Sequence, residues 1–294
     1  MFKPTASDRV FQVINTIFLL LILAVVIYPL VFVLSASVSE PEMLLKGEVW
    51  LFPKGFTLDS YRRVFQNRDI LIGYINTIKY TVVGTVINLF MTIAAAYPLS
   101  RKDFYGRGVI TAMMVFTMFF SGGLIPRFLL VRDLGLYNTM WALILPGAVS
   151  VWNITIMRTF FQTGVPYEIQ EAAMIDGCSN IRILTRIVLP LSMPVIFVMV
   201  MFYSVGHWNA YFNALIYLTD RAKYPLQVIL REILIQENMG DMASIMDEGV
   251  IRQMMLAEGL KYAVVVVANL PVLMIYPLIQ KHFTKGVMLG GLKG

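Results

Sequence analysis

Charged and redox-active side chains are scarce in this sequence. Charged residues make up only 14% of the 294 residues, against about 25% in soluble domains. The single cysteine, Cys178, excludes an intrachain disulfide, and the two histidines, His207 and His282, lie far apart in the chain. No Gly-x4-Gly-Lys-Ser/Thr run is present, so the phosphate-binding loop of P-loop proteins is missing. These absences argue against a soluble enzyme, a membrane hydrolase with a His/Asp cluster and a nucleotide hydrolase.

Long apolar runs take the place of the missing charges, since 58% of the residues are apolar. A helix needs roughly 20 such residues to cross the hydrocarbon core of a membrane. Six stretches qualify, and we expect them at 11–34, 74–98, 109–130, 139–157, 189–212 and 262–280. The sequence therefore predicts an all-α membrane protein with six transmembrane helices in a single domain, residues 1–294.

The first apolar run has an alternative interpretation as a signal peptide. Lys3 and Arg9 precede it, and the small residues Ser35-Ala36-Ser37 follow it. A signal peptide has an apolar region of about 7–15 residues, which is shorter than the run at 11–34. Its removal would also leave an odd number of spans, with the two termini on opposite sides. We favour an uncleaved first helix.

The distribution of positive charge predicts the orientation in the membrane. Four segments, the N-terminal tail, 99–108, 158–188 and 281–294, carry an excess of basic over acidic residues equal to the whole formal net charge of +6. Lys and Arg accumulate in short loops on the cytoplasmic side. We therefore expect both termini and the 158–188 loop in the cytoplasm. The two long outer loops, 35–73 and 213–261, are expected to contain short helices at 59–65 and 228–236.

Polar and aromatic side chains within or beside the spans are candidates for a translocation path. Polar groups in a membrane helix tend to face the interior of the bundle, where amides and aromatic rings suit a polar solute. The alternative is that they join helices to one another or anchor them at the interface. The candidates are Asn88, Asn153, Tyr203, His207, Trp208, Asn209, Tyr211 and Asn213. The spans contain no Asp or Glu, which argues against a secondary transporter or channel with an intramembrane carboxylate.

The loop between the fourth and fifth spans has the pattern of two short helices. Pro166 suits the start of a helix over 167–176, and Gly177 is placed to end it. Ser179 or Asn180 can cap a second helix, in which Ile181, Leu184 and Val188 would share one face. Two short helices meeting at a glycine form a rigid projection.

Such a projection could contact a partner protein. Small Ala172 and Ala173 would let the partner approach closely, and Glu171 would offer it a charge. The alternative is an amphipathic hairpin on the membrane surface without a partner.

This loop carries a motif: Glu-Ala-Ala, three residues, Gly, nine residues, Ile, any residue, Leu-Pro. The matching residues are Glu171, Ala172, Ala173, Gly177, Ile187, Leu189 and Pro190. In this motif, and over nearly its whole length, the chain resembles the sugar permeases of ABC importers, of the maltose-permease type. The stretch 208–217 and the glycine-rich end 283–294 are similar to the carbohydrate branch. Residues 120–126 and 219–221 look most like a sub-branch that imports larger oligosaccharides.

The resemblance implies a type I ABC importer permease fold in a bacterial inner membrane, with the 163–190 loop containing the coupling helix. Expected partners are a second, homologous permease, two copies of a cytoplasmic ATPase that binds Mg-ATP, and an extracytoplasmic solute-binding protein. The chain itself would bind no cofactor, metal or nucleic acid. The resemblance places Glu171, Ala172, Ala173, Asp176, Gly177, Ile187, Leu189 and Pro190 at the ATPase contact. It adds a contact by the C-terminal tail, through Lys285, Gly286, Gly290, Gly291 and Lys293. The implied activity is sugar uptake by alternating access.

Overall fold

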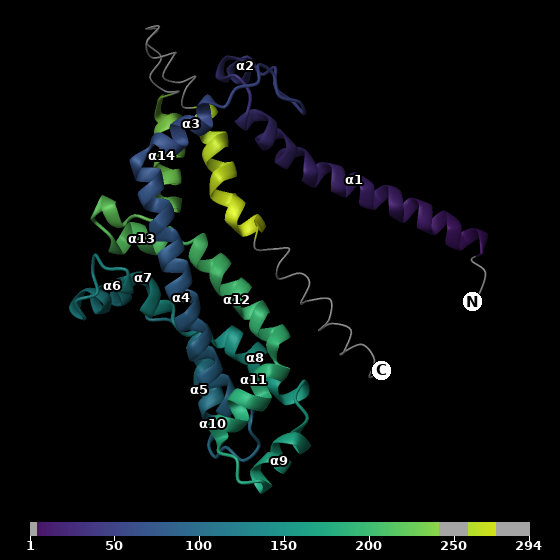
Figure 1. The fold of residues 1–294 in the computed structure, drawn as a ribbon, viewed down its shortest axis with the longest axis vertical. Coiled ribbons are helices and arrows are strands. Elements are labelled where there is room, and N and C mark those ends of the chain that lie inside the picture. The colour runs from purple at the N-terminus through teal and green to yellow at the C-terminus, as the bar shows by residue number, and fades with distance from the viewer. Residues whose placement is uncertain (1–4, 241–257, 275–294) are drawn as a thin grey trace. The chain divides into compact units, whose positions relative to one another are not determined.

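The computed structural model describes residues 5–240 and 258–274, and within these ranges the chain is helical and contains no strand (Figure 1). The expectation of an all-α protein is confirmed for this part of the chain. The chain divides into two compact units, one formed by Met1–Ile70 and Leu230–Leu270, the other by Leu71–Ile229 and Pro271–Gly294. The expectation of a single domain remains a prediction.

The first unit contains the longest apolar surface of the described residues. Helix α1 (Ala6–Ser37) begins at Thr5, which forms a capping box with Asp8. Its large apolar side chains between Val10 and Leu34 are exposed around the whole helix. A helix that is apolar on all sides needs an apolar environment, so α1 fits the membrane span expected at 11–34.

Two short helices and a second apolar helix complete the first unit. They are α2 (Pro41–Leu45), α3 (Asp59–Gln66) and the helix at 258–274. The Ser37 hydroxyl lies 2.8 Å from the Tyr61 hydroxyl and joins the end of α1 to α3. Helix α3 confirms the helix expected at 59–65. The span expected at 262–280 is helical as far as residue 274, and its remainder lies outside the described residues.

The second unit is organised around α4 (Arg68–Ser100), which contains the span expected at 74–98. A buried core joins α4 to α8 (Val151–Thr163), α9 (Tyr167–Ile175) and α12 (Met193–Trp208). Its residues are Ala96, Tyr97, Leu99, Ile154, Met157, Phe161, Val165, Ala173, Ile183, Val188, Val195, Met199 and Tyr203. Close packing of this kind is what holds helices together within lipid, where apolar burial alone gives little stabilisation.

The expected third span is not one straight helix. It is divided into α5 (Arg107–Phe119) and α6 (Leu124–Asp133), which meet at 111°. Gly123 at the junction has φ +84°, a conformation that glycine adopts without steric cost. The Gly122-Gly123 pair therefore redirects the chain between the end of α5 and the start of α6.

The expected fourth and fifth spans are also bent, and both bends contain proline. Helix α7 (Trp141–Ile144) and the 3-10 turn η1 (Leu145–Gly147) meet α8 at 51°, and Pro146 lies within η1, just before the break. The segment Asn180–Leu191 meets α12 at 82°, with Pro194 in the first turn of α12. Proline lacks the N–H that a continuous helix requires and clashes with the preceding turn. The stretch expected at 189–212 is therefore divided between α11 (Leu189–Leu191) and α12, and Phe212 begins a separate helix, α13 (Phe212–Tyr217).

The described residues contain two helices that could each cross a membrane, or up to five spans if each bent pair counts as one. The count of six depends on the span at 262–280 and remains a prediction. Within the described residues, the loop expected at 213–261 contains the 3-10 turn η3 (Arg221–Lys223) and α14 (Leu226–Gly240). Helix α14 confirms the helix expected at 228–236.

Candidate functional site

Helix α9 has the start and end that its sequence predicts. Pro166 is the residue before its first turn, and Glu168 provides a negative charge in that turn. At the other end Gly177 has φ +74°. The Gly177 N–H donates to Met174 O at 3.0 Å, and the Cys178 N–H donates to Ala173 O at 2.9 Å. These two bonds form a Schellman motif, which fixes the angle at which the chain leaves α9.

The two faces of α9 have different environments. Gln170 and Ala173 are buried, whereas Glu171, Ala172 and Asp176 are exposed. The small side chain at Ala172 is therefore available to a partner, as expected. Ala173 differs from the expectation, because it packs into the core of its own chain. One face of α9 therefore packs against the core, and the opposite face is exposed.

The second helix begins as expected, but its faces differ from the prediction. The Ser179 hydroxyl accepts a hydrogen bond from the Arg182 N–H and caps α10 (Asn180–Ile183). Ile181, expected to share a face with Leu184 and Val188, is 75% exposed, whereas Ile183 is buried together with Val188. The reason is η2 (Leu184–Val188), a π-helix. A π-turn bonds each residue to the fifth one along, so Ile183 and Val188, five apart, share the inner face.

The last motif residues lie at the end of this segment. Ile187 and Leu189 pack against the core, and Pro190, in α11 (Leu189–Leu191), is exposed. The motif therefore has two parts in the structure. Glu171, Ala172 and Gly177 lie on the surface, while Ala173, Ile187 and Leu189 fix that surface to the core.

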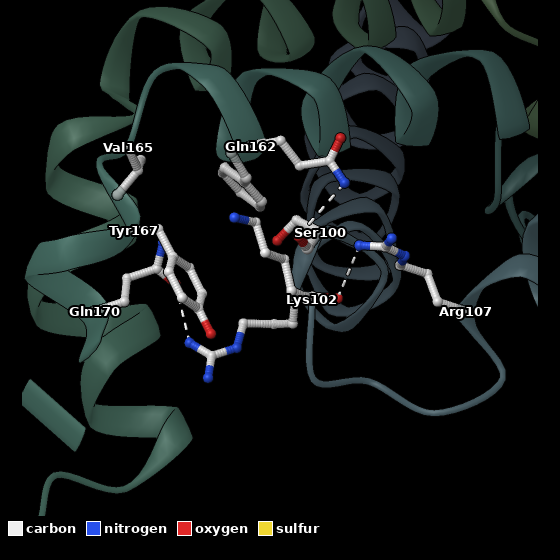
Figure 2. Close-up of a pocket in the computed structure, with 9 residues that line it drawn as sticks. Ser100, Lys102, Arg107, Gln162, Val165, Tyr167 and Gln170 are labelled. Atoms are coloured by element: carbon white, nitrogen blue, oxygen red, sulfur yellow. Dashed lines mark hydrogen bonds between the residues drawn. The ribbon is translucent and has the colours of Figure 1, made fainter. Parts of the chain in front are cut away.

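Arg101 joins α9 to the end of α4, and the sequence did not predict this role. Only 5% of Arg101 is exposed. Its guanidinium donates to the Gln170 side-chain oxygen at 3.1 Å and to Asp103 at 3.0 and 3.1 Å. A third contact reaches Met174 Sδ at 3.0 Å. Figure 2 shows Gln170 and Tyr167 of α9 beside the chain that leaves α4. A buried arginine with a carboxylate partner is a strong connection, because its hydrogen bonds are charge-assisted.

The ion pair of Arg101 persists at neutral pH. Hydrogen bonding from Arg101 holds the pKa of Asp103 below its ordinary value of 3.8. A carboxyl group with a depressed pKa stabilises the folded state above its unfolded pKa and loses that contribution only as the pH falls through the folded value. The pair is therefore charged over the pH range in which a cell membrane operates.

Two large apolar side chains on either side of the Gly177 turn are exposed. Ile175 is 87% exposed and Ile181 is 75% exposed. Together with Glu171 and Ala172 they form what we call the α9 outer face. A patch of exposed apolar side chains with a polar rim is a candidate protein contact surface. The sequence showed both isoleucines, but periodicity assigned Ile181 to the wrong face.

The candidate path residues fall into two groups. In the first, Asn88 Oδ1 lies 2.6 Å from His207 Nε2, and Asn88 Nδ2 donates to Gly147 O at 2.7 Å. Tyr203 OH lies 2.6 Å from Thr92 Oγ1. Trp208 packs edge-on against Tyr74. These contacts join α4 to α12 and, through Asn88, to the bend before α8, as the alternative interpretation of interhelical bonding describes.

The members of the second group of candidate path residues differ in their exposure. Asn153 is buried on α8, Asn213 is half-buried, and Asn209 and Tyr211 are exposed at the end of α12 and beyond it. The assignment of a translocation path remains a prediction for both groups. The tail residues Lys285, Gly286, Gly290, Gly291 and Lys293 lie outside the described residues.

Comparison with known proteins gives a family match and close relatives. Residues 69–289 match the family described as binding-protein-dependent transport system inner membrane component. The chain is 43% identical to Protein LplC of Bacillus subtilis (strain 168), over 99% of this chain and 97% of that protein. It is 42% identical to the polygalacturonan/rhamnogalacturonan transport system permease protein YtcP of the same organism, over 98% of this chain and 100% of that protein.

A solved structure supports the same relationship. The crystal structure of a bacterial ABC transporter involved in the import of the acidic polysaccharide alginate contains a chain that is 31% identical in sequence. The superposition has a TM-score of 0.86 and covers 96% of this chain and 100% of that chain.

Proposed function

The chain belongs to the family of binding-protein-dependent transport system inner membrane components, and we propose that it is the permease subunit of an ATP-driven importer of an oligosaccharide. It is a membrane component and not an enzyme. ATP hydrolysis takes place on a separate ATPase, which binds Mg-ATP. The observation that carries the proposal is the geometry of α9, whose inner face is held by the core and Arg101 while its outer face is exposed.

The α9 outer face is suited to receive an ATPase. Glu171 supplies a charge for a basic partner, Ala172 permits close approach, and Ile175 offers apolar surface. A displacement of α9 would pass to α4 through Arg101 and through the common core. Helices α4 and α12 would move together, because the Asn88–His207 and Thr92–Tyr203 contacts connect them. Alternating access then follows from movement of this connected group as a body.

The proposed assembly has further members. An extracytoplasmic binding protein delivers the sugar, and a second homologous permease completes the path between two copies of the ATPase. Both termini and α9 lie on the cytoplasmic side of a bacterial inner membrane, as the charge distribution favours. The glycine-rich tail, with Lys285, Gly286, Gly290, Gly291 and Lys293, extends the ATPase contact. Three of the candidate path residues could still contact a sugar. Asn209 and Tyr211 are exposed, and Asn213 is half-buried.

The substrate class comes from the relatives. One is named for polygalacturonan and rhamnogalacturonan, and the solved structure is of a transporter that imports alginate. We therefore propose an oligosaccharide derived from a polysaccharide of this kind. The alternative of a secondary transporter or channel has no comparable support, because the family itself is binding-protein-dependent.

The substitution Glu171→Lys tests the function. We expect sugar uptake to fall to background, because a like-charge contact at an interface costs several kcal/mol. Asp133→Lys, the same charge reversal at an exposed residue expected on the outer side, serves as the control and should leave uptake nearly normal. The measurement is accumulation of labelled neutral and acidic oligosaccharides in cells with matched membrane levels of each variant. Normal uptake in the Glu171→Lys cells would contradict the proposal.

A further inference from the structure

A cavity of about 430 Å³ lies between the end of α4, the end of α8 and the start of α9 (Figure 2). Its polar side is formed by Ser100, Lys102, Arg107 and Tyr167, and its apolar side by Phe161 and Val165. Figure 2 shows Lys102 between Tyr167 and Arg107, with Gln162 above them. Arg101 and Gln170, which connect α4 to α9 in the proposed transport function, also line the cavity, but that function assigns no ligand to it.

Two cations at the cavity have no carboxylate partner within the described residues. Lys102 Nζ lies 4.9 Å from the centre of the Tyr167 ring, a cation–π contact that leaves its N–H groups available. Arg107 donates one N–H to Arg101 O at 3.1 Å and keeps the remaining donors of its guanidinium. By contrast, Arg101 is already neutralised by Asp103. The cavity therefore has a net positive charge and several unused donors.

The expected position of the membrane would place the cavity near the lipid headgroups. Helix α4 has 33 residues, which corresponds to about 50 Å at 1.5 Å per residue. The hydrocarbon core is roughly 30 Å thick, and the headgroups extend the membrane to about 40–45 Å. Helix α4 is thus long enough to cross the membrane and emerge from it, and since the expected span ends at residue 98, we expect Ser100, the last residue of α4, among the headgroups. Basic pockets between membrane helices at this level bind anionic headgroups.

We propose that this cavity binds the phosphate of an anionic phospholipid, with Lys102 and Arg107 as its cationic ligands. The buried side chains of Phe161 and Val165 give the glycerol and upper acyl chain an apolar wall. The position of Tyr167, the first residue of α9, means that the lipid contacts the same helix that receives the ATPase. An anionic lipid would thereby stabilise α9 in its attached position. This lipid proposal depends on the proposed transport function in one respect, which is that the 158–188 loop lies on the cytoplasmic side.

The test uses the complete transporter with its partner subunits in nanodiscs. One set contains only phosphatidylcholine, and the other also contains phosphatidylglycerol. We expect native mass spectrometry to detect retained phosphatidylglycerol on the unaltered complex. The double variant Lys102→Gln, Arg107→Gln should bind it about 30-fold more weakly, which is about fivefold for each charge removed at a membrane surface. The variant Lys3→Gln, Arg9→Gln removes the same charge from the same expected side and should retain the lipid.

ATPase activity provides a second readout. The unaltered complex should hydrolyse ATP severalfold faster with phosphatidylglycerol, and the Lys102→Gln, Arg107→Gln complex should show equal rates in both lipids. Equal lipid retention by the two double variants would overturn the proposal. Dissociation of the ATPase from the Lys102→Gln, Arg107→Gln complex would also overturn the proposal. It would indicate that Lys102 and Arg107 bind the ATPase and not a lipid. Stimulation by inorganic phosphate in phosphatidylcholine would assign the site to free phosphate. Lipid retention is measured without sugar, so it is independent of whether the oligosaccharide is transported.

Discussion

Sugar uptake should fall stepwise across three substitutions at Gly177, with Gly177→Asn close to normal, Gly177→Ala reduced and Gly177→Pro inactive. The cause is backbone conformation, because Gly177 has φ +74° and a Cβ there would meet nothing within 4 Å. Asn tolerates the left-handed conformation, whereas an ordinary L-residue pays about 1–2 kcal/mol for it. Proline holds φ near −65° and has no N–H, so it also removes the bond from Gly177 to Met174 O.

The comparison of Asn with Ala makes this series specific. Asn is the larger side chain, so a steric conflict with a partner would impair Gly177→Asn more than Gly177→Ala. The measurement is initial uptake rate normalised to the amount of each variant in the membrane. Impairment that follows side-chain size would contradict the role of the Schellman turn. An active Gly177→Pro would show that the angle between α9 and α10 does not matter for transport.

The substitution Arg101→Leu should reduce sugar uptake about tenfold or more while ATP hydrolysis by the assembled transporter continues. A hydrogen bond to a charged group contributes about 1.5–3 kcal/mol, and Arg101 links the end of α4 to α9 through Gln170 and Met174. Loss of these contacts leaves the common core as the connection between α9 and α4, so a displacement of α9 would move α4 less. We therefore expect hydrolysis and transport to become uncoupled.

Asp103→Asn is the matched control for Arg101. It removes the carboxylate charge, but Asp103 is exposed and the Arg101–Gln170 bond is retained. The quantity to compare is sugar transported per ATP hydrolysed in proteoliposomes. This ratio should fall in Arg101→Leu and stay near normal in Asp103→Asn. A parallel fall in hydrolysis and transport in Arg101→Leu would indicate a defect in assembly or folding instead.

Features set by local chemistry were predictable from the sequence. The start of α9 at Pro166, its end at Gly177 and the cap at Ser179 depend on residues within a few positions of one another. The motif also identified the exposed Glu171. The broken spans were visible as Gly122-Gly123, Pro146 and Pro194, but a long apolar run conceals such breaks when it is judged by composition alone.

Features that depend on the packing of distant segments were not predictable. Arg101 contacts Gln170, which lies 69 residues further along the chain, and His207 contacts Asn88 across 119 residues. The π-helix that brings Ile183 inward is a second example. Its sequence, Leu-Thr-Arg-Ile-Val, has no residue that requires a five-residue turn. The need arises from the core into which Ile183 and Val188 pack.

Crosslinking from α9 tests the central claim, contact between this chain and an ATPase, most directly. The chain has one cysteine, so Cys178→Ser gives a background in which Ile175→Cys can carry a photoactivated crosslinker. Leu134→Cys, at an exposed apolar residue expected on the outer side, is the control. In membranes that contain the whole transporter, we predict an adduct with the ATPase from Ile175→Cys, altered by ATP, and none from Leu134→Cys. No ATPase adduct from Ile175→Cys, or equal adducts from both positions, would contradict the account.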